Sequence, residues 1–358
     1  MTITAEERRA RILEVVRELG TVRVIDLADR IGTAAVTVRR DVAALAEAGL
    51  LRRSHGAVSL PQDASPTVRE GRDRVIGMLV PTVGPYFDEI IDGARVAATA
   101  AGARLVLGIS TYESADDRAQ VDQLLDAGLD GLLLTPNWRP ANGAVNTSWI
   151  RDLPVPAALV ERRAPADSAA AELDSVGSDH RHGVLLALRH LRALGHESVG
   201  LAARLDSWTA GEVRAGYEEG VRLLGLEPQP VIDINRPGID TDGLAARIAE
   251  AVARGVRAFL VHNDQEAIQL TPLLRARGLR APDDLALISY DDVFASLASP
   301  PLTAVSPPRR AVGAGAVELM LRRIDSGPEL PVHHVQLLPD LKVRTSCGGT
   351  GTGTGQAD

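Results

Sequence analysis

The chain has 358 residues, and its length, composition and charge exclude several classes of protein. Apolar residues make up 45% and charged residues 24%, which is enough for large cores and excludes disorder throughout the chain. No run of about 18 apolar residues occurs, which excludes a membrane-spanning helix, and the N-terminus lacks the basic and then apolar pattern of a secretory signal. The single cysteine, Cys347, excludes an intrachain disulfide framework and a cysteine-rich metal site. We therefore expect a cytoplasmic protein of two or three domains.

Charge is spread unevenly along the chain. Residues 1–60 hold 10 arginines against 8 aspartates and glutamates, a net charge of +2, and the remainder holds 29 basic and 39 acidic residues, a net charge of −10. Basic surfaces attract polyanions, whereas acidic surfaces repel them. The difference indicates that only the N-terminal segment meets nucleic acid.

Three short helices are predicted in this basic segment. Thr4 to Glu7 has the pattern of a capping box, after which apolar residues recur at helical spacing as far as Gly20. The same spacing recurs up to Gly32 and, after a short turn, up to Gly49. Each apolar stripe is too narrow to be buried alone, so the three helices should share one core in a helix-turn-helix arrangement.

The third helix and the segment after it carry the residues expected to contact DNA. Val38, Val42 and Leu45 form the inner face of that helix, which leaves Arg40 pointing outward beside a hydroxyl and small apolar groups, a combination that suits the major groove. The segment 50–58 indicates two short strands around a Ser-His-Gly tip, a wing with basic side chains for phosphates or the minor groove. The alternative is that these arginines only solvate a small helical domain. The candidate DNA-binding residues are Thr37, Arg39, Arg40, Arg52, Arg53 and His55.

The segment from Arg8 to about Leu60 resembles the N-terminal winged helix-turn-helix of the DeoR family of bacterial regulators. The resemblance centres on Thr37-Val38-Arg39-Arg40-Asp41-Val42 and on Gly49-Leu50-Leu51-Arg52-Arg53-Ser54-His55-Gly56-Ala57. Ala34 departs from the family pattern, which usually has a serine opening the recognition helix, and Thr33 is the alternative cap. The resemblance implies that this segment binds double-stranded operator DNA.

A short polar linker with a proline at each end, residues 61–66, is followed by about 270 residues in which apolar strands alternate with helices. This alternation is typical of parallel sheets covered by helices on both faces, and its length favours two lobes with a cleft between them. Strands are expected at 75–80, 104–108, 131–134, 155–160, 198–201, 231–234, 258–261 and 285–289, and helices at 88–101, 118–127, 182–194, 211–224, 241–254, 266–277 and 309–324.

Aromatic residues are scarce, and most of them follow predicted strands. In open parallel sheets the ligand binds beyond the carboxyl ends of the strands. Aromatic faces hold sugar rings through their C–H groups and bases through stacking, while Asn, Asp and Arg bind hydroxyls. The alternative for any one ring is that it packs beneath a loop. Seven of the ten aromatic residues lie at such exits, namely Tyr86, Phe87, Tyr112, Trp138, Trp208, Tyr290 and Phe294.

Residues from about Arg74 to Arg344 resemble the effector-binding domain of the LacI/GalR regulators, which shares its fold with periplasmic sugar-binding proteins. The motifs that carry the resemblance include Val75 to Pro81 followed by Gly84-Pro85-Tyr86-Phe87, then Arg214-Ala215-Gly216-Tyr217, Asn263-Asp264, Tyr290-Asp291-Asp292 and Pro300 to Val305. The resemblance implies effector contacts by Tyr86, Phe87, Asp179, Arg204, Asn263 and Asp291. The strand exits add Tyr112, Trp138, Arg162 and Trp208 to the candidate effector-binding residues.

The predicted fold class is therefore α/β, with an N-terminal winged helix-turn-helix and a two-lobe, periplasmic-binding-protein-like domain built on parallel sheets. We expect a DNA-binding domain at 1–60, a linker at 61–73, an effector-binding and dimerisation domain at 74–345 and a disordered tail at 346–358. The run Gly313-Ala314-Gly315 begins like a dinucleotide fingerprint, but no strand precedes it, which favours helix packing.

These features predict a ligand-responsive transcriptional regulator, expected to be a repressor. Its partners would be operator DNA, a small-molecule effector (a sugar, or less often a nucleoside) and a second copy of the chain in a homodimer. The alternatives are a cytoplasmic sugar- or nucleoside-binding protein without a regulatory role and an enzyme built on the two-lobe scaffold. No phosphate-binding loop, nucleophile elbow or complete metal-ligand spacing occurs, so we expect no cofactor and no metal.

Overall fold

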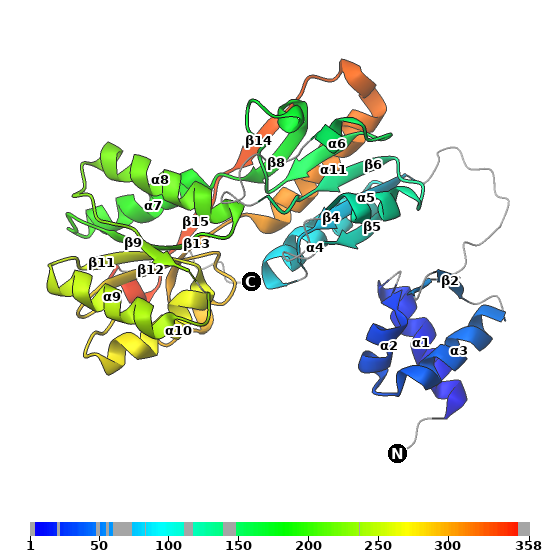
Figure 1. Cartoon of the computed structure of the whole chain (residues 1–358), viewed down its shortest axis with the longest axis horizontal. Helices are drawn as coiled ribbons and strands as arrows, with labels where there is room; N and C mark the ends of the chain where they lie inside the picture. The colour runs from blue at the N-terminus through cyan, green and yellow to red at the C-terminus, as the bar shows by residue number, and fades with distance from the viewer. Residues whose placement is uncertain are drawn as a thin grey trace, which may run out of the picture. The chain divides into compact units, whose positions relative to one another are not determined.

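The computed structural model describes residues 4–19, 22–47, 51–54, 57–59, 74–82, 84–110, 117–138, 148–235 and 237–349 (Figure 1). The chain divides into two compact units, residues 1–72 and 73–358, which we call the head and the body. The division falls inside the segment 61–73 that the sequence marks as a linker.

The head consists of three helices around one apolar core and a small antiparallel sheet. The helices are α1 (Ala5–Leu19), α2 (Val24–Ile31) and α3 (Ala35–Glu47). The strands are β1 (Val22–Arg23), β2 (Arg52–Ser54) and β3 (Ala57–Ser59), in the order β1-β3-β2. Ile12, Leu27 and Val38, one from each predicted stripe, are fully buried in the shared core. The helix-turn-helix and the two-stranded wing are therefore confirmed.

Local interactions explain where two helices of the head begin. The backbone N–H of Thr4 donates to Glu7 Oε2 at 2.9 Å and that of Glu7 donates to Thr4 Oγ1 at 3.3 Å, which is the predicted capping box of α1. Gly32, between α2 and α3, has a φ of +68°, a conformation that glycine adopts without steric cost, so it permits the tight turn before the third helix.

One lobe of the body, which we call the first lobe, contains a six-stranded parallel sheet in the order β14-β8-β7-β6-β4-β5. Helices α4 and α11 pack on one face of this sheet over Ile76, Met78 and Val176, and α5 packs on the other face with Leu124 against Leu79. The strands are β4 (Val75–Val80), β5 (Arg104–Ile109), β6 (Gly131–Leu134), β7 (Ala157–Val160), β8 (Asp174–Ser178) and β14 (His334–Leu337); the helices are α4 (Pro85–Ala100), α5 (Asp117–Leu125), α6 (Ser148–Arg151) and α11 (Arg309–Ser326).

The second lobe contains a six-stranded sheet in the order β10-β9-β11-β12-β13-β15. Helices α7 and α8 cover one face of this sheet and α9 and α10 cover the other, as Figure 1 shows. The strands are β9 (Gly200–Arg204), β10 (Ile232–Ile234), β11 (Ala258–His262), β12 (Ala286–Tyr290), β13 (Thr303–Ser306) and β15 (Asp340–Lys342); the helices are α7 (His180–Ala193), α8 (Trp208–Leu224), α9 (Thr241–Ala253) and α10 (Asp264–Ala276). Strand β15 pairs antiparallel with β13, so the prediction of parallel sheets is wrong at this edge.

Small residues let α4 and α11 approach at backbone distance in the first lobe. A Cβ at Gly93 would lie 2.1 Å from the carbonyl oxygen of Arg310, and a Cβ at Gly313 would lie 1.9 Å from that of Ile90. Neither position has room for a side chain, because the clash in both cases is with backbone. The interpretation of the Gly313 run as a helix-packing segment is confirmed.

The two lobes are not consecutive in the sequence. In the described part of the body the chain passes three times between them, after β8, after β13 and after β14. Strand β14 is therefore the last strand of the first lobe in the sequence, and β15, which follows after two intervening residues, is the last strand of the second. Strands β8 and β14 are neighbours in the first sheet, and β13 and β15 are neighbours in the second, so the three connections start from adjacent strands of each sheet.

The predicted start of the tail is wrong. Residues 345–347 form a short 3₁₀ helix in which Ser346 and Cys347 are buried. Ser346 Oγ donates to the carbonyl of Leu287 at 2.5 Å and accepts from the backbone N–H of Thr303 at 2.8 Å, so this segment ties β12 to β13. The remaining residues of the predicted tail, 350–358, lie outside the described residues.

Candidate functional site

A pocket of about 310 Å³ lies where the carboxyl ends of strands from both lobes meet, and we call it the interlobe pocket. The first lobe contributes the first turn of α4 and the residues after β7, and the second lobe contributes the ends of β9, β11 and β12. This is the position that the carboxyl-end rule predicts for a ligand. The volume lies at the lower end of the range for small-molecule sites.

Three aromatic side chains form the apolar wall of the interlobe pocket, namely Tyr86, Phe87 and Phe294. Tyr86 and Phe87 are adjacent in α4 and contact each other edge to face, with ring centroids 5.4 Å apart. The guanidinium of Arg309, at the start of α11, lies 5.6 Å from the centroid of the Tyr86 ring and fixes its position through a cation–π contact. The pocket therefore has preformed flat faces.

Asp291 lies on the floor of the pocket, directly after β12. Its carboxylate accepts a hydrogen bond from Asn263 Nδ2 at 3.1 Å, and its carbonyl accepts one from Arg309. Its φ of 91° lies in the left-handed region, a strained conformation for an aspartate, and the Arg309 contact helps to hold it there. Burial, with the nearby charge of Asp264, raises the pKa of Asp291 from 3.8 to about 6.

The loop after β12 is held in place by Asp264 at the start of α10. One carboxylate oxygen, Asp264 Oδ2, accepts hydrogen bonds from the backbone N–H groups of Val293, Phe294 and Ala295, at 2.7, 2.6 and 3.1 Å. These bonds fix the loop that carries the Phe294 ring into the pocket. Asp264 thus acts on the site through the backbone of its neighbours.

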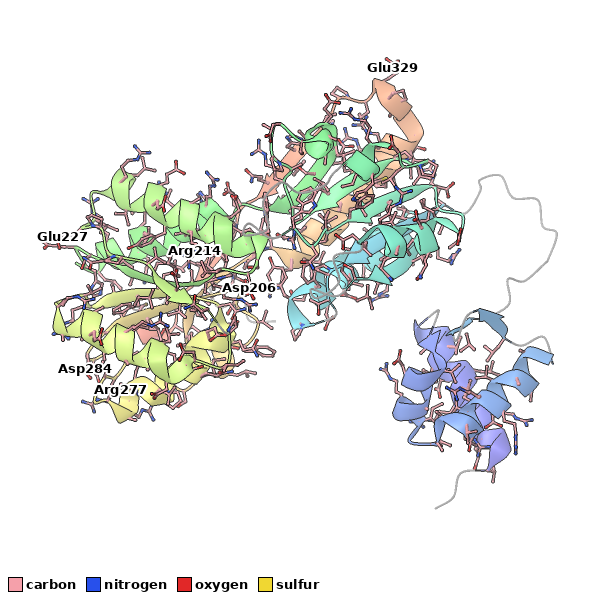
Figure 2. All side chains as sticks on the ribbon, viewed as in Figure 1. Asp206, Arg214, Glu227, Arg277, Asp284 and Glu329 are labelled. Atoms are coloured by element: carbon pink, nitrogen blue, oxygen red, sulfur yellow. The ribbon has the colours of Figure 1, made fainter. Side chains whose placement is uncertain are left out.

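The end of β9 brings a charged pair to the same pocket. Arg204 donates to both carboxylate oxygens of Asp206, at 2.8 and 2.9 Å. Arg214 of α8 supports the strand end, because it donates to the carbonyls of Ala203 and Arg204 at 2.6 and 3.0 Å (Figure 2 labels Arg214 and Asp206). The Arg204–Asp206 pair presents both a donor and an acceptor to the pocket.

Three polar atoms of the pocket are buried and have no hydrogen-bond partner among the described residues. They are the hydroxyl of Tyr86, Nδ1 of His262 and Oδ1 of Asn263. Burial, with the charge of Arg204, lowers the pKa of His262 to about 3, so its ring is neutral at physiological pH. Buried polar groups in folded proteins are nearly always paired, so three orphans among the residues that line one pocket are unusual.

The structure brings six of the ten candidate effector-binding residues together in this pocket: Tyr86, Phe87, Arg162, Arg204, Asn263 and Asp291. The expectation that one pocket holds the whole set is wrong for Trp138, Asp179 and Trp208. Trp138 is 5% exposed and packs in the core of the first lobe, in edge-to-face contact with Trp208. Asp179 caps α7 and lines a separate cavity together with Trp208. Tyr112 lies outside the described residues.

Tyr290 also departs from the aromatic pattern, because it lies in the core of the second lobe. Its side chain is fully buried and its hydroxyl donates to the carbonyl of His180 at 3.1 Å. The list of candidate effector-binding residues leaves out His262, Asp264 and Phe294, which line the pocket, although Phe294 was among the aromatic residues expected at strand exits. All three lie at strand exits, so the carboxyl-end rule applied without a preference for residue type would have included them.

In the head, α3 presents the predicted face. Arg39 and Arg40 are exposed, Thr37 is half-buried, and Val36 is 71% exposed. Asp41 points the other way: it is buried, and accepts hydrogen bonds from Nε of Arg8 at 2.5 Å and Nε of Arg9 at 3.1 Å.

Burial opposes ionisation of Asp41, but the two arginines outweigh it and lower the pKa of its carboxyl group. The carboxylate therefore ties α1 to α3, and the outer face of α3 is left to Arg39 and Arg40. Strand β2 carries Arg52 and Arg53, but their side chains, and His55 altogether, lie outside the described residues.

Comparisons with known proteins match both units. The profile of the DeoR-like helix-turn-helix domain matches residues 8–64, and that of the periplasmic binding protein-like domain matches residues 188–347. The chain is similar to the HTH-type transcriptional repressor CytR of Escherichia coli (strain K12), with 26% identity over 266 residues that cover 73% of this chain and 76% of the repressor. It is similar to the arabinose metabolism transcriptional repressor of Geobacillus stearothermophilus, with 24% identity over 324 residues, 87% of this chain and 86% of that one.

Two solved structures share the fold. The transcriptional regulator CelR–cellobiose complex superposes with a TM-score of 0.65 at 23% identity and covers 87% of this chain and 90% of that chain. The lac repressor dimer bound to operator and the anti-inducer ONPF superposes with a TM-score of 0.65 at 22% identity and covers 78% of this chain and 95% of that chain. In the described segments no helix combines the length and the apolar character needed to cross a bilayer.

The fold and the site together define a ligand-responsive, DNA-binding transcriptional regulator. It combines a DeoR-like helix-turn-helix domain with a periplasmic binding protein-like domain, which are the two kinds of domain that the sequence predicted.

Proposed function

We propose that the chain is a cytoplasmic homodimeric repressor whose operator binding is controlled by a neutral sugar in the interlobe pocket. The observation that carries this proposal is the occurrence of three orphan polar atoms among the residues that line a pocket with aromatic walls. Sugar hydroxyls both donate and accept, so they suit a phenol, a neutral imidazole and an amide oxygen at once. The rings of Phe87 and Phe294 suit the C–H faces of the same ligand.

The charge of the pocket favours a neutral ligand over a phosphorylated one. Three aspartates line the pocket, Asp206, Asp264 and Asp291, together with two arginines, Arg162 and Arg204. Arg204 is already paired with Asp206, and Arg162 donates to the carbonyls of Pro136 and Glu161 at 2.9 and 2.8 Å. A dianionic phosphate would meet buried carboxylates, whereas hydroxyl groups can donate to them.

Control of DNA binding by the ligand follows from the fact that both lobes contribute residues to the pocket. Tyr86 and Phe87 belong to the first lobe and Asn263 and Asp291 to the second, so a ligand that contacts both pairs stabilises one relative arrangement of the lobes. A ligand changes operator affinity only by its differential affinity for the two arrangements, a coupling of typically 1–3 kcal/mol. The CelR–cellobiose complex, which shares the fold, supports a sugar as the ligand.

The head is proposed to read DNA as winged helix-turn-helix domains do, with α3 in the major groove and the wing on the backbone. The contacting residues would be Thr37, Arg39 and Arg40 on α3, and Arg52, Arg53 and His55 on the wing. The named relatives act in transcription, which supports a regulator and not an enzyme. A dimer would place two heads on a two-fold symmetric operator.

Two experiments test this proposal. The first is a thermal-shift screen of monosaccharides, disaccharides, pentitols and nucleosides. The second is a gel-shift titration of the promoter of the chain's own gene, with and without the ligand that the screen finds. We expect a sugar to raise the melting temperature and to change operator affinity five-fold or more. Asp291→Asn should remove the thermal shift, whereas Asp283→Asn, at an exposed aspartate outside the pocket, should not. Ligand binding without any saturable DNA binding would instead indicate a sugar- or nucleoside-binding protein without a regulatory role.

A further inference from the structure

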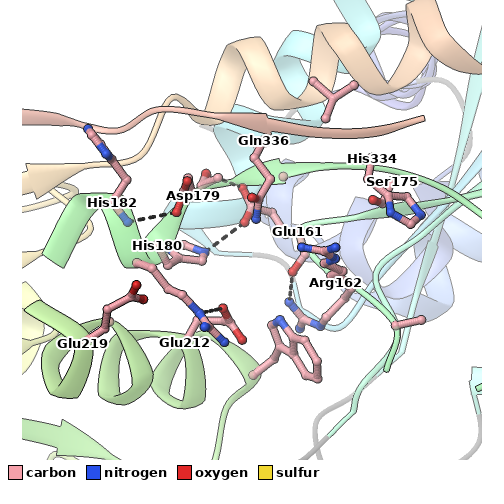
Figure 3. A pocket seen from close by; sticks show the side chains of 18 of the residues that line it. Glu161, Arg162, Ser175, Asp179, His180, His182, Glu212, Glu219, His334 and Gln336 are labelled. Carbon is pink, nitrogen blue, oxygen red and sulfur yellow. Dashed lines mark hydrogen bonds and ion pairs between the residues drawn. The ribbon is translucent and has the colours of Figure 1, made fainter. Parts of the chain in front are cut away.

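A second cavity, of about 690 Å³, lies beside the interlobe pocket, and we call it the lateral cavity. It is lined by β8, β14 and the loop after β7 from the first lobe, and by α7 and α8 from the second (Figure 3). It shares only Glu161 and Arg162 with the interlobe pocket. The two cavities therefore flank the same strand exit and are separate spaces.

Two of the four acidic groups of the lateral cavity, Glu161 and Glu212, form ion pairs with neighbours. Glu161 accepts from Ser178 Oγ at 2.7 Å and pairs with His180 Nε2 at 3.2 Å. Glu212 accepts from Arg181 at 2.9 Å, and the charge of Glu219 also acts on Arg181. Asp179, which caps α7, accepts from the backbone N–H of its helix.

Two arginines in the loop after β7 form no salt bridge with any described residue. Arg162 is 6% exposed, yet its guanidinium donates only to the carbonyls of Pro136 and Glu161. Arg163 is exposed, and no carboxylate of the described residues lies within ion-pair distance of its side chain. Figure 3 places Arg162 and His334 toward one end of the cavity and Glu212 and Glu219, on α8, toward the other.

The charge of Arg162 acts on the Glu161 carboxylate, but no carboxylate of the described residues lies within ion-pair distance, so the guanidinium keeps donors that an anionic group at this end would accept. Planar guanidinium groups match phosphate and carboxylate oxygens. Trp208 lines the same cavity and offers a flat apolar face, and Ser175 and Gln336 offer side-chain hydrogen bonds. The lining thus suits a small molecule with an anionic end and a ring.

From these contacts we propose that the lateral cavity is a second ligand site, for a small phosphate monoester that carries a ring. The phosphate lies against Arg162 and Arg163, and the ring lies toward Trp208. The shared chemistry fits a sugar phosphate and a mononucleotide equally, and the experiment separates them. This proposal adds a second input to the proposed function and does not require that the interlobe ligand be a sugar.

Binding in the lateral cavity is coupled to the interlobe pocket. The Glu161–His180 pair joins the exit of β7 in the first lobe to the start of α7 in the second, directly at the connection after β8. Because a phosphate ester would contact both lobes beside this pair, it favours one arrangement of the lobes and changes the affinity of the interlobe ligand. Linkage requires the reverse effect to be equal in size.

The test is isothermal titration calorimetry of the full-length chain with two matched pairs, ribose 5-phosphate against ribose and AMP against adenosine. We expect saturable binding of a phosphate ester and at least tenfold weaker binding to Arg163→Ala, since one charge-assisted contact is lost. Arg189→Ala, at an exposed arginine of α7 outside the cavity, is the matched control and should bind normally. Arg163 is exposed, so its substitution leaves the fold intact.

A second variant locates the ligand. Asp291→Asn alters only the interlobe pocket, so phosphate-ester binding should persist in it even where sugar binding is lost. The proposal is overturned if neither phosphate ester saturates the chain, if Arg163→Ala binds as tightly as wild type, or if Asp291→Asn abolishes binding. Failure of the sugar screen with persistent binding of the ester would refute the interlobe proposal and leave this one standing.

Discussion

Replacing Asp291 with asparagine should stabilise the unliganded chain at neutral pH. The wild-type carboxylate is buried beside Asp264, and its pKa is raised from 3.8 to about 6. The folded chain therefore keeps a proton that the unfolded chain releases between about pH 4 and pH 6. Stability falls as the pH rises through this window, and the penalty is complete above it.

The size of the effect follows from the shift of the pKa. Going from 3.8 to about 6 corresponds to roughly 3 kcal/mol of unfolding free energy, at about 1.36 kcal/mol for each pH unit. Asparagine removes the charge but keeps an oxygen that accepts from Asn263 Nδ2, and the backbone contact with Arg309 is unchanged. Asparagine also tolerates a positive φ. Little native packing is therefore lost.

Thermal and urea unfolding at pH 7.5 and at pH 4 measure this prediction. Asp291→Asn should gain up to about 3 kcal/mol at pH 7.5, a rise of several degrees in melting temperature, and most of that gain should be absent at pH 4. Asp283→Asn, at an exposed aspartate, should change stability little at either pH. An Asp291→Asn chain that is less stable than wild type at pH 7.5, or equally stabilised at both values, would refute the reasoning.

Three further outcomes are expected. Arg40→Ala should weaken operator binding by roughly tenfold to a hundredfold in gel-shift titrations, while Arg30→Ala leaves it unchanged, and equal losses would contradict the predicted outer face of α3. Asp264→Ala should cost roughly 2–4 kcal/mol in urea unfolding, because three backbone N–H groups lose their acceptor, and a cost below about 1 kcal/mol would speak against that role. Binding of the interlobe ligand should change the tryptophan fluorescence emission, because the rings of Trp138 and Trp208, from different lobes, lie 6.1 Å apart. The emission change should be absent in Trp208→Phe and present in the control Trp149→Phe.

Much of the fold was predictable because its signals are local. Continuous apolar runs such as 75–80 and 131–134 match strands at both ends, and the spacing of Ile12, Leu27 and Val38 places the core of the head. Strands β8, β13, β14 and β15 were missed. Polar residues interrupt the apolar pattern on which the prediction depends, as in Asp174–Ser178 and His334–Leu337, and β14 and β15 are mostly exposed.

The site was harder to predict because its boundaries depend on packing between distant segments. Ligands bind beyond the carboxyl ends of parallel strands, and this rule identifies the loops near a ligand. It does not show which side chains of a loop face the pocket. Trp138 and Trp208 both follow strands, yet they pack against each other and away from the interlobe pocket. Similarly, nothing local to Tyr290 shows that its hydroxyl reaches His180, 110 residues earlier.

The threefold passage of the chain between the lobes has a consequence for how such a protein can be rebuilt. Neither lobe is one continuous stretch of polypeptide, so no single cut separates the two lobes with all of their strands. The DNA-reading unit, in contrast, is one uninterrupted segment. A single crossover is therefore enough to exchange it, which is consistent with a DeoR-like head joined to a periplasmic binding protein-like body.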